Sequence, residues 1–338
     1  MNSMIKPTKC VDASDPKVFE QAAQLLASGR LVAFPTETVY GLGADAVNPD
    51  AVCSIFEAKG RPSQHPLIVH GASATDWSHC VELNDWAERL MHRFWPGPLT
   101  LILNKTKRIP DVVTGGQKSV GIRCPDHWAA QALLRAFSQV GSGLVAAPSA
   151  NRFTQLSPTQ ACHVMSQLEG RIDWVIDAGA CEVGLESTIV DLTADEPTLL
   201  RPGMISVDAL EQELNRSLAS RTSASPRASG DMAKHYSPRT VTRLIPPGTV
   251  GLMRLASLTG RKIVALCIND AFFAKMLAQN QRESVLIKMP SEPPAYAREI
   301  YAALHQADSM QCDLILVEQP PNLAVWLPVI DRLKRAAT

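Results

Sequence analysis

Seven short apolar runs occur in the first two thirds of this 338-residue chain, and segments with helical periodicity separate them. Runs of this length, aliphatic or β-branched and bounded by Pro, Gly or Asn, are typical of buried strands. They are Leu31–Phe34, Pro66–His70, Leu99–Leu103, Val120–Arg123, Leu144–Ala147, Thr188–Leu192 and Thr198–Arg201. Because helices and strands interleave without a strict strand–helix–strand repeat, we predict an α/β fold built on an open, twisted mixed sheet.

One helix has clear start and stop signals. Asn48-Pro49-Asp50 combines a capping residue with a proline in the first turn, and Lys59-Gly60 places glycine just past the end. Further helices are expected over Pro16–Ser28, Trp86–Phe94, Trp128–Gln139 and Pro158–Leu168.

The composition changes abruptly at Arg216–Asp231, which is rich in Ser, Ala, Arg and Pro and has no hydrophobic period. This predicts a linker. We therefore divide the chain into a catalytic domain at 1–215, a linker at 216–239 and a small C-terminal domain at 240–338.

The C-terminal part shows a second alternation of strands and helices. The expected strands are Val241–Ile245, Lys262–Ile268, Ser284–Lys288 and Asp313–Val317, and the expected helices are Ala271–Gln279, Pro294–Ala307 and Val329–Ala336. Tyr296, Ile300, Tyr301 and Leu304 lie on one face of the second helix. The pattern predicts a small Rossmann-like, three-layer α/β domain with a parallel sheet.

Charge and cysteine usage exclude several classes of protein. The chain carries 33 basic and 33 acidic side chains, whereas a general nucleic-acid binder needs a basic excess. Eight cysteines are scattered without a CxxC pair, and no His or carboxylate cluster has metal-ligand spacing, so no protein-held metal is expected. The polar start of the chain has no signal-peptide core and no apolar run is long enough to span a membrane, which favours a cytoplasmic protein.

Polar side chains stand at or just after the ends of the apolar runs. His70, Arg123 and Arg201 close three of them, Ser149 follows a fourth, and Ser187 opens a fifth. In open α/β sheets ligands bind in the crevice beyond strand ends, so these side chains can form one anion-binding pocket. A single such residue is more often a solvated charge or a turn former. The coincidence of several favours the functional interpretation.

Known nucleotide-binding and nucleophile motifs are either absent from the sequence or stand in an unsuitable context. Gly41-Leu42-Gly43-Ala44-Asp45-Ala46 has GxGxxA spacing, but the expected helix begins only after Asn48, so a dinucleotide fingerprint is not favoured. The chain has no GxxxxGK[ST] loop and no GxSxG elbow. Ser149-Ala-Asn-Arg152 has Arg where a Ser–Lys pair needs Lys.

Eight motifs occur in order at consistent spacing. They are Phe34-Pro-Thr-Glu-Thr-Val-Tyr-Gly-Leu-Gly43, Lys59-Gly-Arg-Pro62, Pro66-Leu-Ile-Val-His70, Trp95-Pro-Gly-Pro-Leu-Thr100, Ala147-Pro-Ser-Ala-Asn151, Glu186-Ser-Thr-Ile189, Leu200-Arg-Pro-Gly203 and Lys234-His-Tyr-Ser-Pro238. Together they resemble the threonylcarbamoyl-adenylate synthase family, whose signature pairs a KxR with a later SxN. The resemblance covers Leu25 to Pro238, and the remaining segment resembles the C-terminal domain of the family's long form.

The resemblance implies a YrdC-like fold that makes L-threonylcarbamoyl-AMP from L-threonine, bicarbonate and ATP, with release of pyrophosphate, for N6-threonylcarbamoyladenosine formation in tRNA. It implies a nucleotidyltransferase in which Lys59 and Arg61 are catalytic. The threonine pocket carried over by motif is Thr38, His70, Arg123, Ala147 and Ser187. The ATP side is Lys59, Arg61, His65, Ser119, Ser149, Asn151, Ser157, Arg201, His235 and Tyr236.

The resemblance also implies partners. Mg²⁺ is expected to arrive on the ATP phosphates without protein ligands. The product is expected to pass to the downstream tRNA threonylcarbamoyl transferase, with no membrane association and no requirement for tRNA binding. The linker is expected to act as a lid over the active site. Its Ala228–Met232 segment and the late Gln319–Trp326 segment depart from the family pattern.

Two alternative functions remain open at this point. A carbamoyl-transfer enzyme of the hydrogenase-maturation kind uses a similar domain, but it needs zinc-finger-like cysteine spacing that this chain lacks. A non-catalytic RNA-binding or ribosome-maturation module on the same fold is disfavoured by the zero net charge and by the intact threonine-pocket residues.

Overall fold

The computed structural model describes residues 7–72, 77–230, 236–246, 260–269 and 284–337. The chain forms two compact units, one of Met1–Phe153 with Ser157–Asp231 and one of Thr154–Leu156 with Met232–Thr338. The first unit therefore includes much of the expected linker. In addition, three residues from the middle of the chain belong to the second unit.

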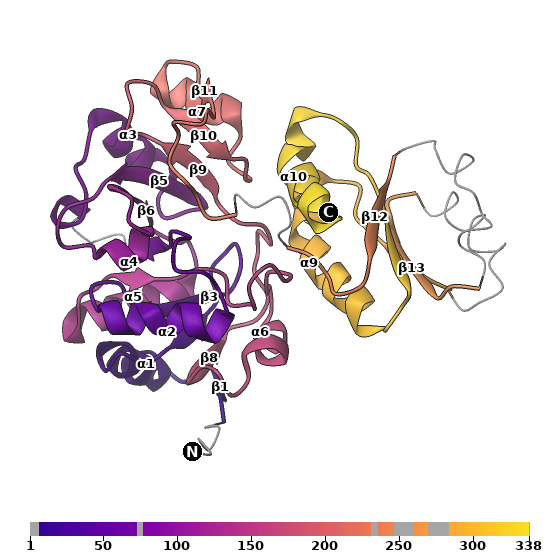
Figure 1. Ribbon diagram of the computed structural model, residues 1–338, viewed down its shortest axis with the longest axis horizontal. Helices are drawn as coiled ribbons and strands as arrows, with labels where there is room; N and C mark the ends of the chain where they lie inside the picture. Colours follow the sequence, from indigo (N-terminus) through magenta and orange to yellow (C-terminus); the bar gives the residue numbers. More distant parts are fainter. Residues whose placement is uncertain (1–6, 73–76, 231–235, 247–259, 270–283, 338) are drawn as a thin grey trace. The chain divides into compact units, whose positions relative to one another are not determined.

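The described part of the first unit contains one mixed sheet of 11 strands, in the order β1-β8-β2-β3-β7-β4-β6-β5-β9-β10-β11 (Figure 1). The strands are β1 (Lys9–Asp12), β2 (Val32–Phe34), β3 (Gly41–Asp45), β4 (Ile68–His70), β5 (Leu99–Asn104), β6 (Ser119–Arg123), β7 (Val145–Ala146), β8 (Trp174–Asp177), β9 (Thr188–Asp191), β10 (Thr198–Arg201) and β11 (Ala219–Ser220). The sheet contains parallel pairs such as β4–β6 and antiparallel pairs such as β5–β6, which confirms the predicted mixed sheet.

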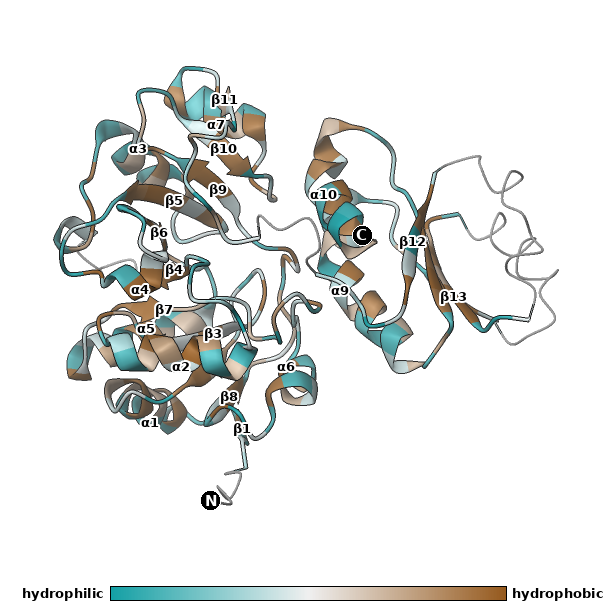
Figure 2. Ribbon diagram, viewed as in Figure 1, coloured by the Kyte–Doolittle hydropathy of each residue, from teal (hydrophilic) through white to brown (hydrophobic). Residues whose placement is uncertain are grey.

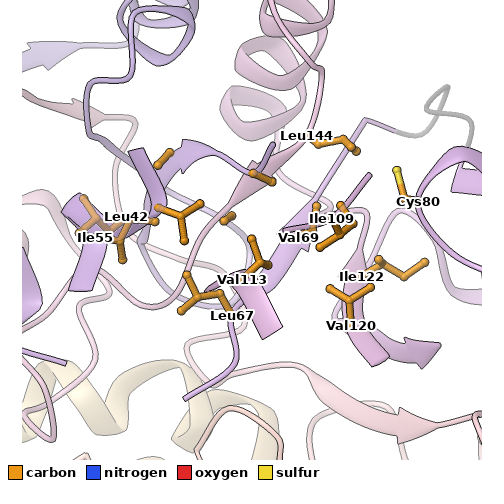
Figure 3. Close-up of a cluster of buried hydrophobic side chains, with 14 of the residues drawn as sticks. Leu42, Ile55, Leu67, Val69, Cys80, Ile109, Val113, Val120, Ile122 and Leu144 are labelled. Atoms are coloured by element: carbon orange, nitrogen blue, oxygen red, sulfur yellow. The ribbon is translucent and has the colours of Figure 1, made fainter. Parts of the chain in front are cut away.

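Helices cover both faces of this sheet. They are α1 (Lys17–Ala27), α2 (Pro49–Lys59), α3 (Asp85–Phe94), α4 (Asp111–Thr114), α5 (Trp128–Val140), α6 (Ala161–Leu168) and α7 (Val207–Leu214). Successive residues of β2 point to opposite faces: Val32 and Phe34 pack in the core under α1 and α5, whereas Ala33 packs in the larger core on the other face. Figure 3 shows part of that larger core, where Ile55 of α2 lies near Leu42.

Helix α2 begins and ends where the sequence predicts. The Asn48 side chain accepts hydrogen bonds from the backbone N–H groups of Asp50 and Ala51 at 3.1 and 3.2 Å. Gly60 follows the helix with a φ of 66°, a conformation that glycine adopts without steric strain.

The glycines of the GxGxxA motif lie in strand β3, where packing in the sheet accounts for them and no nucleotide-binding role is needed. Strand β3 runs antiparallel to β2 and β7, and helix α2 starts only at Pro49. A Cβ atom on Gly43 would lie 2.8 Å from Val145 and 2.9 Å from Phe34. The glycine is therefore required by close packing inside the sheet.

The segment expected to be a linker is partly built into the first unit. Ala219–Ser220 forms the short edge strand β11, which pairs with β10. Further along, Ala228 is buried against Ile102, Ile189 and Leu200. A short, locally hydrophobic contact of this kind leaves no periodic signal in the sequence.

The second unit has a parallel sheet in the order β12-β15-β13-β14, as predicted (Figure 1). Its elements are β12 (Thr242–Ile245), β13 (Ile263–Cys267), β14 (Ser284–Lys288), α9 (Pro293–Ser309), β15 (Leu314–Glu318) and α10 (Leu327–Ala336). Strand β13 is hydrophobic throughout and fully buried (Figure 2). Tyr296, Ile300, Tyr301 and Leu304 of α9 are all buried, which confirms the predicted face. The helix expected at 271–279 lies outside the described residues.

Within this second unit, the three residues Thr154–Leu156 contact Ser237, near the end of the predicted linker. The backbone N–H of Ser237 donates to the carbonyl oxygen of Thr154 at 3.0 Å, and Gln155 forms a parallel bridge with Ser237. Thr154 and Tyr236 both have positive φ values, 67° and 60°, so the chain makes a constrained turn on each side of this joint. No helix in the described part of the chain is long and apolar enough to cross a membrane.

Candidate active site

Arg123 lies at the end of β6 and is almost completely buried. Its Nη1 atom donates to Thr38 Oγ1 at 2.9 Å, and its Nε donates to the carbonyl oxygen of Gly97 at 3.4 Å. Its Nη2 atom lies 2.7 Å from Glu37 Oε1, in an ion pair whose side chains are 5% and 4% exposed. These protein contacts together fix the orientation of one guanidinium group.

His70 ends β4 and is the direct neighbour of Arg123 in the parallel β4–β6 register. Its Nδ1 atom lies 3.2 Å from the carbonyl oxygen of Ile68, within hydrogen-bonding distance. Burial and, secondarily, the Arg123 charge lower the pKa of His70 to about 3. His70 is therefore a neutral imidazole at physiological pH.

Lys59, at the end of α2, is fully buried and holds the loop after β7. Its Nζ atom donates to the carbonyl oxygens of Ser149 at 2.5 Å and Asn151 at 2.6 Å. Burial, together with the charges of Arg61 and Arg152, holds its pKa well below the ordinary value. The KxR and SxN motifs are therefore joined directly through the lysine.

Arg61 and His65 lie beside this loop. Arg61 donates through Nη2 to the carbonyl oxygen of Pro66 at 3.1 Å. The Phe153 ring lies 5.7 Å from the Arg61 guanidinium carbon and 5.3 Å, between ring centroids, from His65. The aromatic ring thus contacts two predicted nucleotide-side residues.

Ser187 and Arg201 form a second cluster, at the start of β9 and the end of β10. Arg201 donates through Nε and Nη2 to the carbonyl and hydroxyl oxygens of Ser187, at 3.0 and 3.1 Å. The hydroxyl group of Ser187 also lies 2.7 Å from Thr100 Oγ1. The remaining terminal nitrogen of Arg201 donates to the carbonyl oxygen of Ser229 at 2.9 Å, so this arginine also holds the linker segment.

Gln117 holds the same linker segment from the other side. Its Oε1 accepts from the backbone N–H of Arg227 at 2.7 Å, and its Nε2 donates to the carbonyl oxygen of Arg227 at 3.1 Å. A small cavity here is lined by Ser119, Ile68 and Ala228, among others. Segment 227–229 thus covers the sheet beside the predicted nucleotide-side residue Ser119.

The sequence analysis did not single out two buried carboxylates, Glu37 and Glu186. Glu186 Oε1 accepts a hydrogen bond from Ser157 Oγ at 2.6 Å, and Glu37 pairs with Arg123. Both lie inside motifs used for the family resemblance, directly before Thr38 and Ser187. The sequence signal that could have identified them is their position, since each is an acidic residue next to a predicted pocket residue.

The predicted residues in the first unit occupy connected strand ends and loops. Thr38 and His70 lie beside Arg123, Ala147 donates its backbone N–H to the carbonyl oxygen of Ile68, and Lys59 joins the Ser149–Asn151 loop. Tyr236 belongs to the second unit, where its ring lies 5.9 Å from that of Tyr301 and 5.6 Å from the Arg332 guanidinium carbon. His235 lies outside the described residues, and among those described no three His, Cys, Asp or Glu side chains are grouped to hold a metal.

Comparisons with known proteins cover nearly the whole chain. Residues 24–203 match a family model described as telomere recombination, and residues 205–338 match the threonylcarbamoyl-AMP synthase C-terminal domain. Threonylcarbamoyl-AMP synthase of Bacillus subtilis is 39% identical over 97% of this chain and 94% of that protein. The enzyme of Pyrococcus abyssi is 36% identical over 94% and 93%.

Solved structures give the same result over both units. The crystal structure of P. abyssi Sua5 complexed with L-threonine has a TM-score of 0.85 and 34% identity, and the match covers 98% of this chain and 97% of that one. A structure of a doubly substituted variant of P. abyssi Sua5 has a TM-score of 0.86 and covers 98% of this chain and 96% of that one. The chain therefore belongs to the threonylcarbamoyl-AMP synthase family.

Proposed function

We propose that the protein synthesises L-threonylcarbamoyl-AMP from L-threonine, bicarbonate and ATP, in the cytoplasm, as the first step of N6-threonylcarbamoyladenosine formation in tRNA. One observation carries the proposal: a buried, rigidly held Arg123 flanked by Thr38 and the neutral His70. This arrangement suits a small ligand with a carboxylate and a hydroxyl group. The relatives named threonylcarbamoyl-AMP synthase, together with a structure of P. abyssi Sua5 complexed with L-threonine, support the same substrate.

The reaction has two bond-forming steps. The ammonium group of threonine first loses a proton; the neutral amine then attacks the carbon of bicarbonate, water leaves, and a carbamate forms. A carbamate oxygen then attacks the α-phosphorus of ATP, and the bond to pyrophosphate breaks. The enzyme is accordingly a nucleotidyltransferase. Such a transfer needs positioning and charge stabilisation rather than a protein nucleophile.

Different basic residues bind the two anionic groups of the substrates, the threonine carboxylate and the ATP triphosphate. Arg123 binds the substrate carboxylate, since a guanidinium group matches a carboxylate geometrically. Arg61, Arg201 and the loop held by Lys59 surround the triphosphate, which brings its own Mg²⁺. Segment 227–229 lies over the sheet where it can limit access of water, and this protects a carbamate and a mixed anhydride from hydrolysis.

The product is a reactive anhydride, so direct transfer to the downstream tRNA threonylcarbamoyl transferase suits its chemistry. No tRNA binding by this chain is required for the synthesis itself. The net charge of zero agrees with a small-molecule reaction, because the ligand charges are met by a few buried cations.

Pyrophosphate release by the purified full-length chain tests the proposal. We expect release from ATP only when threonine and bicarbonate are both present, and at least about 100-fold slower release by Arg61→Ala. Arg171→Ala, which removes an exposed arginine of the same unit, serves as the matched control. Absence of release by the folded wild type would refute the proposal and favour an RNA-binding module; normal release by Arg61→Ala would refute only the role of Arg61.

A further inference from the structure

Glu37 is a buried carboxylate with one oxygen lacking a partner. Its side chain is 4% exposed, and Oε1 pairs with Arg123 at 2.7 Å. Neither carboxylate oxygen accepts a hydrogen bond in the described part of the chain, so Oε2 has no hydrogen-bond donor there. A buried carboxylate oxygen without a donor is unfavourable, because burial removes the water that would solvate it.

The backbone holds Glu37 firmly in this position. The hydroxyl group of Thr36 donates to the carbonyl oxygen of Val39 at 2.7 Å and accepts from the backbone N–H of Thr38 at 3.2 Å. The carbonyl oxygen of Glu37 accepts from the N–H of Val183 at 2.7 Å. The orphan oxygen is thus part of a fixed turn and is not a surface side chain folded inward.

The protein contacts of Arg123 leave some of its N–H donors without a hydrogen-bond acceptor. A guanidinium group has five N–H donors, of which Gly97 and Thr38 engage one on Nε and one on Nη1, while Nη2 forms only the ion pair with Glu37. At least one N–H remains on each terminal nitrogen, as a bidentate contact with a carboxylate requires. The same pair therefore presents two free donors and, on Glu37, one free acceptor.

We propose that Glu37 binds the α-ammonium group of the amino-acid substrate while Arg123 binds its carboxylate. The proposal rests on the proposed function and adds a residue that selects for the free amine. Glu37 and Arg123 together carry no net charge, and a zwitterionic amino acid meets this pair with its two opposite charges. Bound in this way, the ammonium nitrogen supplies the donor that Oε2 lacks.

Other acidic groups near Glu37 are poorly placed for this role. Asp126 and Glu182 act electrostatically on the same region, and both are exposed to solvent. A solvated carboxylate binds an ammonium group weakly, because water competes and screens the charges. Asp126→Asn therefore provides a matched control that removes a nearby charge of the same sign.

The test compares L-threonine with 2,3-dihydroxybutanoate, in which a hydroxyl group replaces the amine. Threonine KM and the competitive inhibition constant of the analogue are measured by pyrophosphate release with the full-length wild type, Glu37→Gln, Glu37→Asp and Asp126→Asn. We expect Glu37→Gln to raise the threonine KM at least tenfold and to change the analogue constant less than twofold. Glu37→Asp should recover part of the threonine preference, and Asp126→Asn should match the wild type.

A purely structural role through Arg123 predicts a different result. Loss of Arg123 orientation would weaken threonine and the analogue equally, since both carry the carboxylate. Equal losses, or unchanged threonine binding by Glu37→Gln, would overturn the proposal. If Glu37→Gln fails to fold, Glu37→Asp provides the test. The proposal is then overturned if the threonine KM of Glu37→Asp is not at least tenfold lower than the inhibition constant of the analogue. A wild type without threonine-dependent release would instead remove the proposed function.

Discussion

The side-chain nitrogen of Lys59 lies 2.5 Å from the carbonyl oxygen of Ser149, so a buried amino group holds the backbone of the loop after β7. A second contact, to the carbonyl oxygen of Asn151 at 2.6 Å, makes this a two-point clamp. The KxR and SxN motifs are distant in the sequence, and this clamp joins them in the fold. Lys59 therefore positions other residues, whatever it contributes to phosphate binding.

Replacement of Lys59 by Met should remove the clamp. We expect pyrophosphate release to fall at least about 100-fold, because catalytic donors misplaced by small distances lose most of their effect. Amide hydrogen exchange should accelerate in residues 149–153. Lys105→Met is the control, since that ammonium group binds Asp111 and Ile109 instead. Unchanged exchange in the loop would show that the clamp does not hold it.

Replacement of Gln117 by Ala should loosen the linker segment. Its amide group makes both hydrogen bonds to the backbone of Arg227, and each contributes about 1 kcal/mol. We expect the Arg227 amide to exchange about 30-fold faster, because the two bonds together contribute about 2 kcal/mol. Gln139→Ala, on the exposed end of α5, should leave it unchanged. Equal exchange in the two variants would mean that other contacts retain the segment, namely those of Arg201, of the Arg227 side chain with Gly115 and of buried Ala228.

The depressed pKa of His70 predicts a dependence of stability on pH. Burial lowers its pKa from 6.5 to about 3, so between these values the unfolded chain binds a proton that the folded chain excludes. The free energy of unfolding should therefore fall as the pH drops below 6.5, by about 1.4 kcal/mol per pH unit from this group. Its full contribution is present above pH 6.5.

Urea unfolding at several pH values between about 7.5 and about 5, compared between wild type and His70→Gln, measures this contribution. The variant should show a shallower decline, because its residue at this position does not titrate. His92→Gln, which alters an exposed histidine of α3, should retain the wild-type slope. Parallel curves for wild type and His70→Gln would contradict a neutral, buried His70.

Gly203 should tolerate no larger residue. A Cβ atom at this position would lie 2.3 Å from the backbone nitrogen of Thr188, which cannot move without disturbing Ser187. We expect Gly203→Ala to lower the free energy of unfolding by about 3 kcal/mol, the upper range for overpacking. Gly116→Ala, where nothing lies within 4 Å, should cost only about 1 kcal/mol from its positive φ. Similar losses measured by urea unfolding would count against a steric role.

Strand ends could be predicted from the sequence because a charged residue that closes an apolar run is a local signal. Arg123 and Arg201 close β6 and β10, as expected. Strand β3 could not be predicted, because Gly41–Asp45 has little intrinsic strand preference and becomes a strand only by packing between β2 and β7. Its conformation is decided by tertiary contacts.

Within the site, the residue types were predictable and the pairings were not. The resemblance named Lys59 and Ser149, but the contact of Lys59 with backbone carbonyls requires the folded loop. The carboxylate of Glu37 was passed over because an ion pair between distant residues has no periodicity. Single-sequence reasoning identifies chemical groups, and only the fold assigns their partners.

Residues Thr154–Leu156 belong to the second unit, where they contact Ser237. This limits the places at which the chain can be cut into separate domains. The chain leaves the first unit after Phe153, returns at Ser157 and leaves again after Asp231. A shortened chain ending at Asp231 would keep every strand of the large sheet but lose the backbone partner of Thr154, between Asn151 and Ser157. The two units are therefore not independent modules. Removing one of them also removes chain segments or hydrogen-bond partners that belong to the other.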